Sequence, residues 1–418
     1  MLGEMGKKAR SAARSLAQAT SAQKSAALKR LAERLWAERS LILAANRGDV
    51  EAGEKGGLSA AMLDRLTLNE YRLQGIISNL NAVAELYDPV GERFDAQTLP
   101  NGLKIHKRRV PVGVLAVIYE ARPDVTVEVS GLALKTGNAV ILRGGSETIQ
   151  SNLTLVAAIQ RALTDTALPR DAVQFIDNPD RALVGELLKM HDCVDMLIPR
   201  GGAGLHKFCR ENSAIPVITG GIGICHLFVD ESADPEAALK VIRNAKIQRP
   251  TVCNALDTAL VHEAVAVEFI PRLVETLMSD GVSFRADEHA FAILSGAGRA
   301  QVQAAVPGDF DTEWLSLVLG IKVVADLDEA IDHISVHSTS HSDGILTRDT
   351  RNAEKFASEV DSAVVYINAS TRFTDGAQMG LGAEVAVSTQ RLHARGPMGL
   401  RELTTYKWVV EGDWHVRL

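Results

Sequence analysis

From residue 111 onward, short apolar runs alternate with stretches that have the period of an amphipathic helix. The apolar runs are GVLAVIYE at 113–120, NAVILRGG at 138–145, AVQFID at 172–177, CVDMLIPR at 193–200, IPVITGG at 215–221, ICHLFVD at 224–230, ALDTALVH at 255–262 and SAVVYIN at 362–368. Strands that are apolar along their whole length are typical of a parallel sheet with helices on both faces. The sequence therefore predicts an α/β fold.

Two segments lie outside this alternation. Residues 1–80 carry apolar side chains at helical spacing, for example Leu28, Leu31 and Leu35 and then 41–43, and predict a helical layer. The segment 89–109 is polar, and its Pro-Asn-Gly sequence is typical of a β-hairpin turn. We expect this hairpin to project as an arm and to pair with another strand.

The charge balance excludes some classes of partner. Among 418 residues, 45 Lys and Arg face 52 Asp and Glu, a formal net charge of −7, which argues against general nucleic-acid binding. No apolar run reaches the roughly 18 to 20 residues that span a bilayer, so no membrane segment is expected. The N-terminus is amphipathic and basic, as in mitochondrial leader peptides, but Glu4 and Glu33 within a long helical period favour a surface helix.

The four cysteines are Cys193, Cys209, Cys225 and Cys253. They form no CxxC pair and no Cys/His cluster with zinc spacing, so no metal site is expected. Scattered single thiols are typical of a reducing compartment, and we expect a cytoplasmic protein.

The GxGxxG dinucleotide fingerprint is absent. ILRGGS at 141–146 and IPRGGAG at 198–204 are glycine-rich turns after strands, where a backbone can approach a phosphate at a helix N-terminus. Ordinary tight turns would explain these glycines equally well.

Cys253 lies in NAKIQRPTVCNALDT, where Pro250 restricts the residue before it to extended geometry. A thiol on the turn that follows, with Lys246 and Arg249 nearby in sequence, could have a lowered pKa. The spacing alone favours a small buried hydrophobic residue, although both interpretations stay open at this point. For the other three cysteines that interpretation is favoured more strongly, because Cys193 and Cys225 lie within apolar strands and Cys209 lies on an expected helix.

Two polar segments invite a catalytic interpretation. His341, Ser342 and Asp343 are adjacent, and neighbours on one segment do not easily form a catalytic relay, so turn or capping chemistry is favoured. The segment STRFTDG at 370–376 reads as a polar turn, but an arginine among hydroxyls and glycines also suits a carboxylate or phosphate.

Long stretches of the chain resemble the gamma-glutamyl phosphate reductase family, a branch of the aldehyde dehydrogenase superfamily. These are PVGVLAVIYEARPDVTVE at 111–128, LKTGNAVILRGGSE at 134–147, VDMLIPRGGAGL at 194–205, GGIGICHLFVD at 220–230, QRPTVCNALDTALVH at 248–262, VADLDEAIDHISVHSTSHSDGI at 324–345, VYINASTRFTDGAQMGLGAE at 365–384 and STQRLHARGPMGLRELTTYKW at 388–408. The resemblance covers essentially the whole chain and identifies Cys253 as the catalytic nucleophile.

The resemblance implies an aldehyde dehydrogenase-like architecture of three parts. A cofactor domain with an atypical Rossmann fold would take 1–88 and 110–225, and an α/β catalytic domain would take 226–385. Segments 89–109 and 386–418 would form a β oligomerisation arm and the C-terminal return, with a strand near 403–411. The atypical cofactor fold accounts for the missing fingerprint.

The resemblance also implies the ligands and their residues. NADP(H) would be held at Arg143, Gly144, Gly145, Gly201, Gly202, Gly220 and Glu313, with Arg143 near the adenosine ribose and Glu313 near the nicotinamide ribose. The substrate would meet Arg122, Asn254, Ser370, Thr371 and Arg372, of which Arg372 is expected to bind its anionic end.

The implied reaction is the second step of proline synthesis, which reduces L-glutamyl 5-phosphate to L-glutamate 5-semialdehyde and phosphate. A homodimer or tetramer is implied, and a transient contact with glutamate 5-kinase is a further expectation.

Two departures from the wider superfamily are informative. Hydrolytic aldehyde dehydrogenases carry a glutamate just before the Gly-Gly turn, whereas here Ile218 and Thr219 stand before Gly220, so the base for hydrolysis is missing. The superfamily's oxyanion asparagine is also absent, and Ala121 lies near its place, which leaves the Cys253 backbone N–H as one candidate donor. The alternatives are a hydrolytic aldehyde dehydrogenase, and a thiol hydrolase or non-catalytic scaffold.

Overall fold

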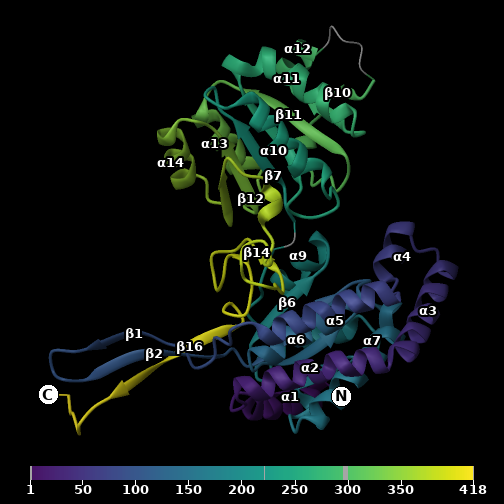
Figure 1. Cartoon of the computed structure of the whole chain (residues 1–418), viewed down its shortest axis with the longest axis vertical. Helices are drawn as coiled ribbons and strands as arrows, with labels where there is room; N and C mark the ends of the chain where they lie inside the picture. Colours follow the sequence, from purple (N-terminus) through teal and green to yellow (C-terminus); the bar gives the residue numbers. More distant parts are fainter. Residues whose placement is uncertain (1, 221, 295–299, 418) are drawn as a thin grey trace. The chain divides into compact units, whose positions relative to one another are not determined.

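The computed structural model describes residues 2–220, 222–294 and 300–417, which form two compact units (Figure 1). The first unit comprises Met1–Thr219, Gly380–Ala386 and Met398–Leu418. The second unit comprises Gly220–Met379 and Val387–Pro397. Among the described residues, no helix is both long and apolar enough to cross a bilayer.

The first unit is built on a parallel four-stranded sheet with the order β5-β4-β3-β6. Its strands are β3 (Val114–Tyr119), β4 (Ala139–Arg143), β5 (Val173–Phe175) and β6 (Met196–Arg200). Every residue of β3 and β4 is buried, as their continuous apolar sequences predict. Because β3 lies between β4 and β6, the strand order reverses at β3, and ligands of open α/β sheets bind at the carboxyl ends of strands beside such a point.

Helices cover both faces of this sheet (Figure 1). They are α1 (Leu2–Leu16), α2 (Ser21–Ala37), α3 (Arg39–Lys55), α4 (Ala60–Leu66), α5 (Glu70–Glu85), α6 (Pro123–Lys135), α7 (Ile149–Asp165), α8 (Ala182–Leu187) and α9 (Ala203–Asn212), with 3-10 turns η1 (Ser146–Thr148) and η2 (Arg170–Ala172). α1, α8 and α9 share an apolar cluster with one face, while α6 and α7 pack on the other with α2 and α5 against them.

The N-terminal helical layer follows the predicted apolar period with one exception. Leu28, Leu31 and Leu35 are buried in α2, but Leu41 is 58% exposed. The chain turns between α2 and α3 at Glu38, which rotates the helical face, so that Ile42 takes the buried position.

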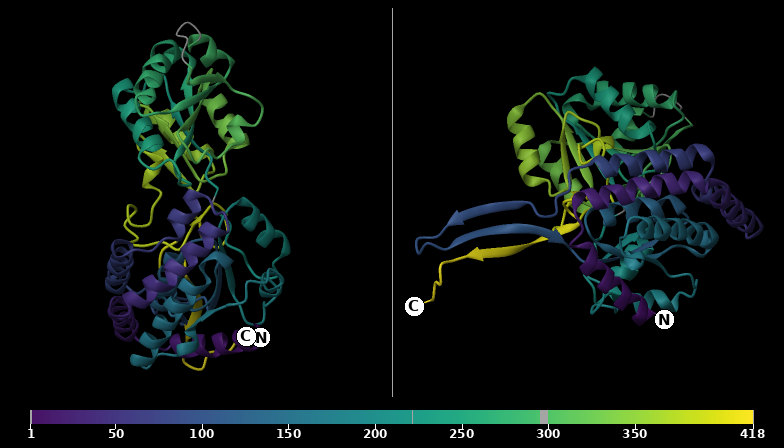
Figure 2. Two further views of the ribbon diagram at one scale, coloured as in Figure 1. Left: turned by 90° about the vertical axis from the view of Figure 1, so that its right-hand side faces the viewer. Right: turned by 60° about the horizontal axis from the view of Figure 1, so that its bottom comes forward.

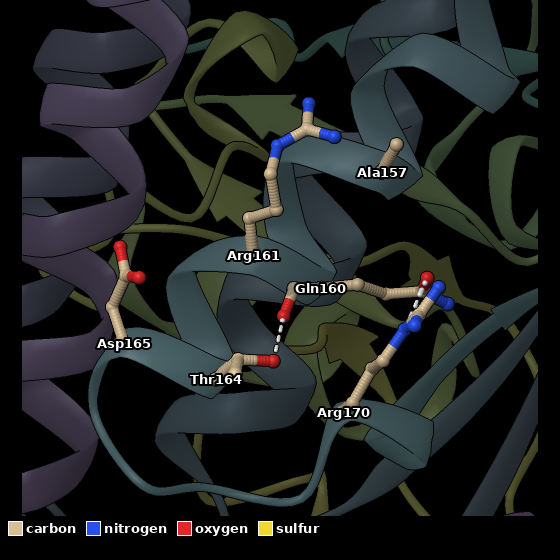
Figure 3. Close-up of a pocket in the computed structure, with 6 residues that line it drawn as sticks. All are labelled: Ala157, Gln160, Arg161, Thr164, Asp165 and Arg170. Atoms are coloured by element: carbon tan, nitrogen blue, oxygen red, sulfur yellow. Dashed lines mark hydrogen bonds between the residues drawn. The ribbon is translucent and has the colours of Figure 1, made fainter.

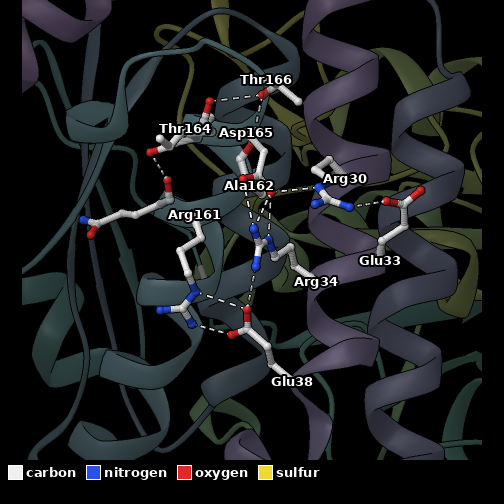
Figure 4. A network of polar contacts seen from close by, with 11 residues as sticks. Arg30, Glu33, Arg34, Glu38, Arg161, Ala162, Thr164, Asp165 and Thr166 are labelled. Atoms are coloured by element: carbon white, nitrogen blue, oxygen red, sulfur yellow. Dashed lines mark hydrogen bonds and ion pairs between the residues drawn. The ribbon is translucent and has the colours of Figure 1, made fainter.

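Ion pairs join this layer to α7 (Figure 4). The Asp165 carboxylate accepts a hydrogen bond from Arg34 Nη2 at 2.9 Å and another from Arg30 Nε at 2.8 Å. One turn earlier on α7, Arg161 Nε donates to Glu38 at 3.1 Å. The contacts fix the outer helices to α7.

The predicted hairpin is present and gains a third strand. β1 (Arg93–Thr98), β2 (Lys104–Pro111) and β16 (Thr404–Glu411) form an antiparallel sheet with β2 in the centre, which extends away from the helices of the first unit (Figure 2). Gly102 adopts φ +91° in the turn, a conformation that favours glycine. The strand expected near 403–411 is therefore the partner of the hairpin within this chain.

The second unit contains a parallel seven-stranded sheet with the order β10-β9-β11-β8-β7-β12-β13. Its strands are β7 (Cys225–Val229), β8 (Leu256–His262), β9 (Ser283–Ala286), β10 (Val302–Ala304), β11 (Val318–Val324), β12 (Ser342–Leu346) and β13 (Val364–Ile367), and a separate pair is formed by β14 (Val387–Ser388) and β15 (Gly396–Pro397). β7 begins at Cys225 and pairs with β8 and β12. The second unit itself begins at Gly220.

Helices cover this second sheet on both faces as well. They are α10 (Pro235–Ile247), α11 (Glu263–Met278), α12 (Glu288–Leu294), α13 (Leu327–His337) and α14 (Thr350–Glu359), with 3-10 turns η4 (Asp309–Asp311) and η5 (Thr371–Phe373). α10, α11 and α12 share one apolar cluster with the sheet, and α13 and α14 share the other.

One expected strand is missing from the first unit's sheet. IPVITGG at 215–221 was expected to extend as a strand, but its described residues form isolated bridges, Val217 to Leu197 and Gly220 to Ser388. Pro216 has no N–H to donate, which limits the pairing of this segment with β6.

Candidate active site

Cys253 lies on the turn between α10 and β8, where Ala255 N–H donates to Val252 O at 3.0 Å. Its side chain is half-buried, as is that of Cys193, whereas Cys209 and Cys225 are buried. Burial raises the pKa of Cys209 to about 11 and that of Cys225 well above its ordinary value. Because the thiolate is the nucleophile, these two thiols are poor candidates for covalent chemistry.

The backbone of Cys253 is held closely from one side. A Cβ added to Gly223 would lie 1.5 Å from Cys253 O, so only glycine permits this approach. Cys225 Sγ lies 3.3 Å from the same oxygen. Gly223 N–H in turn donates to Glu313 Oε1 at 3.0 Å, and burial raises the pKa of Glu313 against the lowering effect of that hydrogen bond.

Lys246, which the sequence places close to the thiol, is bound elsewhere. Its Nζ donates to Leu256 O at 2.8 Å and lies 3.8 Å from Asp257 Oδ1. Burial lowers the pKa of Lys246 to about 8, although Asp257 opposes this, and burial raises the pKa of Asp257 to about 6. The ammonium thus forms a buried ion pair beneath the turn.

The segment 370–374 packs against the Cys253 turn. Asn254 Nδ2 donates to Thr374 O at 2.9 Å, and Thr371 Oγ1 donates to Asn254 O at 2.7 Å. Ser370 caps η5 by accepting Arg372 N–H at 3.3 Å. Four of the predicted substrate residues, Asn254, Ser370, Thr371 and Arg372, therefore come together beside Cys253.

Arg372 brings positive charge to this turn. Its Nε donates to Gln248 Oε1 at 2.8 Å, a contact that the sequence did not suggest. Burial lowers the pKa of Arg372, the neighbouring charge of Arg249 lowers it further, and a Cys253 thiolate would raise it. Two guanidinium groups near one thiol suit an anionic substrate.

The remaining predicted substrate residue, Arg122, belongs to the first unit. It precedes α6, and its Nη2 donates to Asp124 Oδ2 at 3.1 Å. Burial acts to lower the pKa of Arg122, but the charge and hydrogen bond of Asp124 outweigh it and the pKa is raised. Ala121 beside it has φ +37°, and its N–H donates to Glu147 Oε1 at 2.6 Å.

Arg143 ends β4 and is almost fully buried. Its Nη2 donates to Pro179 O at 2.8 Å, its Nη1 donates to Gly144 O, and its Nε finds no partner among the described residues. Burial lowers its pKa. The predicted cofactor-binding arginine therefore carries one buried donor without a partner in the described part of the chain.

The glycines predicted to bind the cofactor differ in their surroundings. A Cβ on Gly144 would meet Asn152 Nδ2 at 2.3 Å, and one on Gly145 would meet Glu147 Oε1 at 2.1 Å. A Cβ on Gly201 would meet the side-chain ends of Glu120 and Leu205 at 2.8 Å, whereas one on Gly220 would meet the backbone oxygen of Val387 at 2.0 Å. Packing therefore requires glycine at 220, while at 144, 145 and 201 the nearest atoms belong to side chains.

Gly202 differs, because a Cβ there would meet no atom within 4 Å. It is the N-cap of α9, directly after β6 and Gly201. The N–H groups at a helix N-terminus bind anions, so this end of α9 is suited to a phosphate.

The adjacent His341, Ser342 and Asp343 do not form a catalytic triad. His341 Nδ1 lies 2.8 Å from Ser342 Oγ, which lies 2.6 Å from Thr374 Oγ1, whereas Asp343 Oδ1 accepts His226 N–H at 2.8 Å. Neighbouring residues of a strand point to opposite faces, so the carboxylate faces away from the serine.

The predicted residues do not lie in the surface hollow of the first unit. Within this shallow hollow, Arg170 Nε is bound to Gln160 Oε1 at 3.1 Å (Figure 3). The hollow is lined by Ala157, Gln160, Arg161, Thr164, Asp165 and Arg170. No group of three or more His, Cys, Asp or Glu within 2–220, 222–294 and 300–417 could hold a metal ion.

Comparisons with known proteins match the whole chain. The aldehyde dehydrogenase family model matches residues 3–306. A gamma-glutamyl phosphate reductase of Psychromonas ingrahamii is 59% identical over 416 residues, which cover 100% of this chain and 99% of that protein. The crystal structure of gamma-glutamyl phosphate reductase from Thermotoga maritima is 50% identical, with complete coverage of both chains and a TM-score of 0.97. An engineered glycolyl-CoA reductase with bound NADP+ shares the fold at 19% identity, 98% coverage of this chain, 96% of that chain and a TM-score of 0.68.

Proposed function

The chain belongs to the aldehyde dehydrogenase family, and from this premise we propose that it reduces L-glutamyl 5-phosphate to L-glutamate 5-semialdehyde and phosphate through a thioester on Cys253. This reaction is the second step of proline biosynthesis. The observation that carries the proposal is the full-length likeness to gamma-glutamyl phosphate reductases, in sequence and in fold.

In the proposed reaction the Cys253 thiolate attacks the acyl carbon of the substrate. The bond from that carbon to the phosphate oxygen breaks, phosphate leaves and a thioester forms. Arg372 attracts the anionic end of the substrate, and Ser370, Thr371 and Asn254 hold the arginine's segment against the turn. A bound nicotinamide cofactor would supply hydride to the thioester carbon. Cys253 would then leave as the thiolate when the semialdehyde is released.

Each unit by itself carries residues that suit part of a nicotinamide cofactor. In the first unit the open N-terminus of α9 at Gly201 and Gly202 would hold the pyrophosphate, and the unsatisfied Nε of Arg143 would bind the adenosine ribose or its 2'-phosphate. In the second unit Glu313 would hold the nicotinamide ribose. The cationic Arg143 supports NADP(H) as the cofactor, and Gly144, Gly145 and Gly220 would allow the backbone to approach it.

Hydrolysis of the thioester would waste the substrate. Ile218 and Thr219 precede Gly220, so the general base that hydrolytic members of the family place there is missing. Phosphate exchange and hydride transfer are then the reactions open to the thioester, which argues against a hydrolytic dehydrogenase.

The arm and the thiols support proposals about assembly and location. The arm presents two open edge strands, β1 and β16, which suit pairing with a second copy in a homodimer or tetramer. Cys193, Cys209 and Cys225 are free thiols, as in proteins of the reducing cytoplasm. A labile acyl phosphate favours direct transfer from glutamate 5-kinase.

The test uses the reverse reaction, with the semialdehyde, NADP+ and phosphate. We expect Cys253→Ser to lower kcat by about a thousandfold or more while NADPH still binds, since the covalent step is lost. Cys193→Ser, which removes another half-buried thiol, is the matched control and should keep its activity. Substantial turnover by Cys253→Ser would remove the nucleophile assignment, and turnover independent of phosphate would support a hydrolytic enzyme instead.

A further inference from the structure

Asp257 is a buried carboxylate for which the proposed reaction has no use. It is 2% exposed and lies four residues after Cys253. In the pairing of β7 with β8, Cys225 lies opposite Leu256 and His226 lies opposite Thr258, so Asp257 is the extra residue of a β-bulge. Bulges redirect side chains and are frequent beside active sites.

The bulge directs the carboxylate to the backbone of two other segments. Asp257 Oδ1 accepts Trp314 N–H at 3.1 Å, and Oδ2 accepts Cys225 N–H at 3.4 Å. One carboxylate thus joins β8, the start of β7 and the loop before β11. Each oxygen serves a different segment, which a group with a single acceptor could not do.

These two segments are the ones that enclose the Cys253 peptide. Cys225 places its Sγ 3.3 Å from Cys253 O, and Gly223 approaches the same oxygen closely. Glu313, next to Trp314, links the two segments by accepting Gly223 N–H at 3.0 Å. The position of Glu313 therefore depends on the anchoring of Trp314, and that of the Cys253 peptide on the anchoring of Cys225.

We propose that Asp257 is a positioning residue, which holds the Glu313 loop and the start of β7 in one frame around the Cys253 peptide. The proposal rests on the proposed function, in which Cys253 is the nucleophile and Glu313 holds the nicotinamide ribose. Asp257 acts through these residues.

Lys246 makes a buried carboxylate tolerable at this position. Its Nζ lies 3.8 Å from Asp257 Oδ1 and donates to Leu256 O at 2.8 Å, and the lysine is fully buried. An unpaired buried charge is strongly destabilising, while removal of both charges of a buried pair is often tolerated. Charge compensation and positioning can therefore be separated by mutation.

Two variants and one control make this separation. Asp257→Asn keeps the size but leaves one acceptor oxygen, and Lys246→Met combined with Asp257→Asn also removes the unpaired ammonium. Asp230→Asn is the control, because Asp230 is a buried carboxylate that accepts three side-chain hydrogen bonds at the opposite end of β7. All are measured below their thermal transitions.

Three quantities are measured in each variant: kcat and KM of the reverse reaction, the Kd of NADPH from its fluorescence, and the rate of Cys253 alkylation by iodoacetamide without ligands. In both Asp257 variants we expect kcat to fall about tenfold or more, as misplacement of a reacting group predicts. NADPH should bind about fivefold more weakly, and alkylation should change by about the same factor. KM for the semialdehyde should change little, since Arg372 Nε is anchored by Gln248.

Each measurement has an outcome that would contradict the proposal. Wild-type values of kcat, NADPH Kd and alkylation in both Asp257 variants would overturn the proposal, and so would equal losses in Asp230→Asn, which would reveal general destabilisation. If Asp257→Asn does not fold, the double variant decides. If the wild-type protein shows no phosphate-dependent turnover, the proposed function is wrong, while the alkylation rates still decide whether Asp257 positions the Cys253 turn.

Discussion

Arg372 is anchored so that its charge stays beside the Cys253 turn. Its Nε is held by Gln248, and its carbonyl lies 3.5 Å from Asn254 Nδ2. The pKa of Arg372 is lowered by burial and by Arg249, which means that the cation is short of compensating negative charge. An anionic ligand would supply this missing negative charge and would therefore bind favourably beside Arg372.

We therefore expect Arg372→Ala to raise KM for the semialdehyde by about tenfold or more, since a hydrogen bond to a charged group contributes about 1.5–3 kcal/mol. The fall in kcat should be smaller. Steady-state kinetics of the reverse reaction measure both. Arg348→Ala is the matched control, because Arg348 is an exposed arginine of the same unit that pairs with Asp234. An unchanged KM in Arg372→Ala would exclude Arg372 from the substrate site.

At the level of residues, the sequence predicted types of chemistry better than contacts. The apolar run around Cys225 correctly favoured a buried thiol there, but spacing alone did not identify Cys253 as reactive, because its exposure depends on the neighbouring segments. Gly144 and Gly145 suggested phosphate binding, but the sequence did not show that a Cβ at these positions would also meet the side chains of Asn152 and Glu147. The bulge at Asp257 has no local signal, since it arises from pairing between β7 and β8.

The arm carries a row of exposed apolar and aromatic side chains on β16. Tyr406, Trp408 and Val410 are alternate residues of β16, about half exposed or more. The Nζ atom of Lys107, on β2, lies 4.6 Å from the ring centroid of Tyr406 and 5.1 Å from the ring centroid of Trp408. Exposed aromatic residues on a strand with an open edge are typical of protein interfaces.

We expect the arm to hold subunits together. The double variant Tyr406→Glu with Trp408→Glu should shift the protein toward a smaller species, because burying carboxylates in an interface is costly. Light scattering after size-exclusion chromatography measures the mass. Trp414→Glu, at an almost fully exposed tryptophan outside the strand, is the control. An unchanged mass in the double variant would contradict the role of the arm.

Element prediction worked where the signal is local. The strand predicted within GVLAVIYE at 113–120 is β3, and the hairpin follows its Pro-Asn-Gly turn. The segment 215–221 shows the limit, because its apolar composition resembles a strand but pairing depends on what lies beside it. The C-terminal chain shows the same limit on a larger scale: 387–397 belongs to the second unit and 398–418 to the first.

Across the whole molecule, buried histidines make stability depend on pH. Burial lowers the pKa of His341 and His206 to about 4 and that of His333 to about 2, from an ordinary value of 6.5. His341 is fully buried, and its Nε2 finds no partner among the described residues. A proton on such a ring would have no acceptor, so the folded protein resists protonation.

The sign of the effect follows from the direction of these shifts. A lowered pKa in the folded state means that the stabilisation is fully present above pH 6.5 and is lost as the pH falls, because the unfolded chain binds protons first. Between pH 6.5 and its pKa in the folded protein, each histidine lowers the free energy of unfolding by about 1.4 kcal/mol for every unit by which the pH falls. Asp257 has the opposite effect, because burial raises its pKa from 3.8 to about 6. Its contribution to the free energy of unfolding therefore increases as the pH falls between these two values.

Denaturant unfolding between pH 7.5 and 5 should therefore show a falling free energy of unfolding, because the three histidines outweigh Asp257, Glu313 and Glu128, the carboxyl groups whose pKa burial raises. His341→Gln should flatten this dependence, because it removes one group that titrates only in the unfolded chain, for a maximum of about 3 kcal/mol near pH 4. Parallel pH profiles for His341→Gln and wild type would show that His341 is protonated as readily in the folded protein as in the unfolded chain.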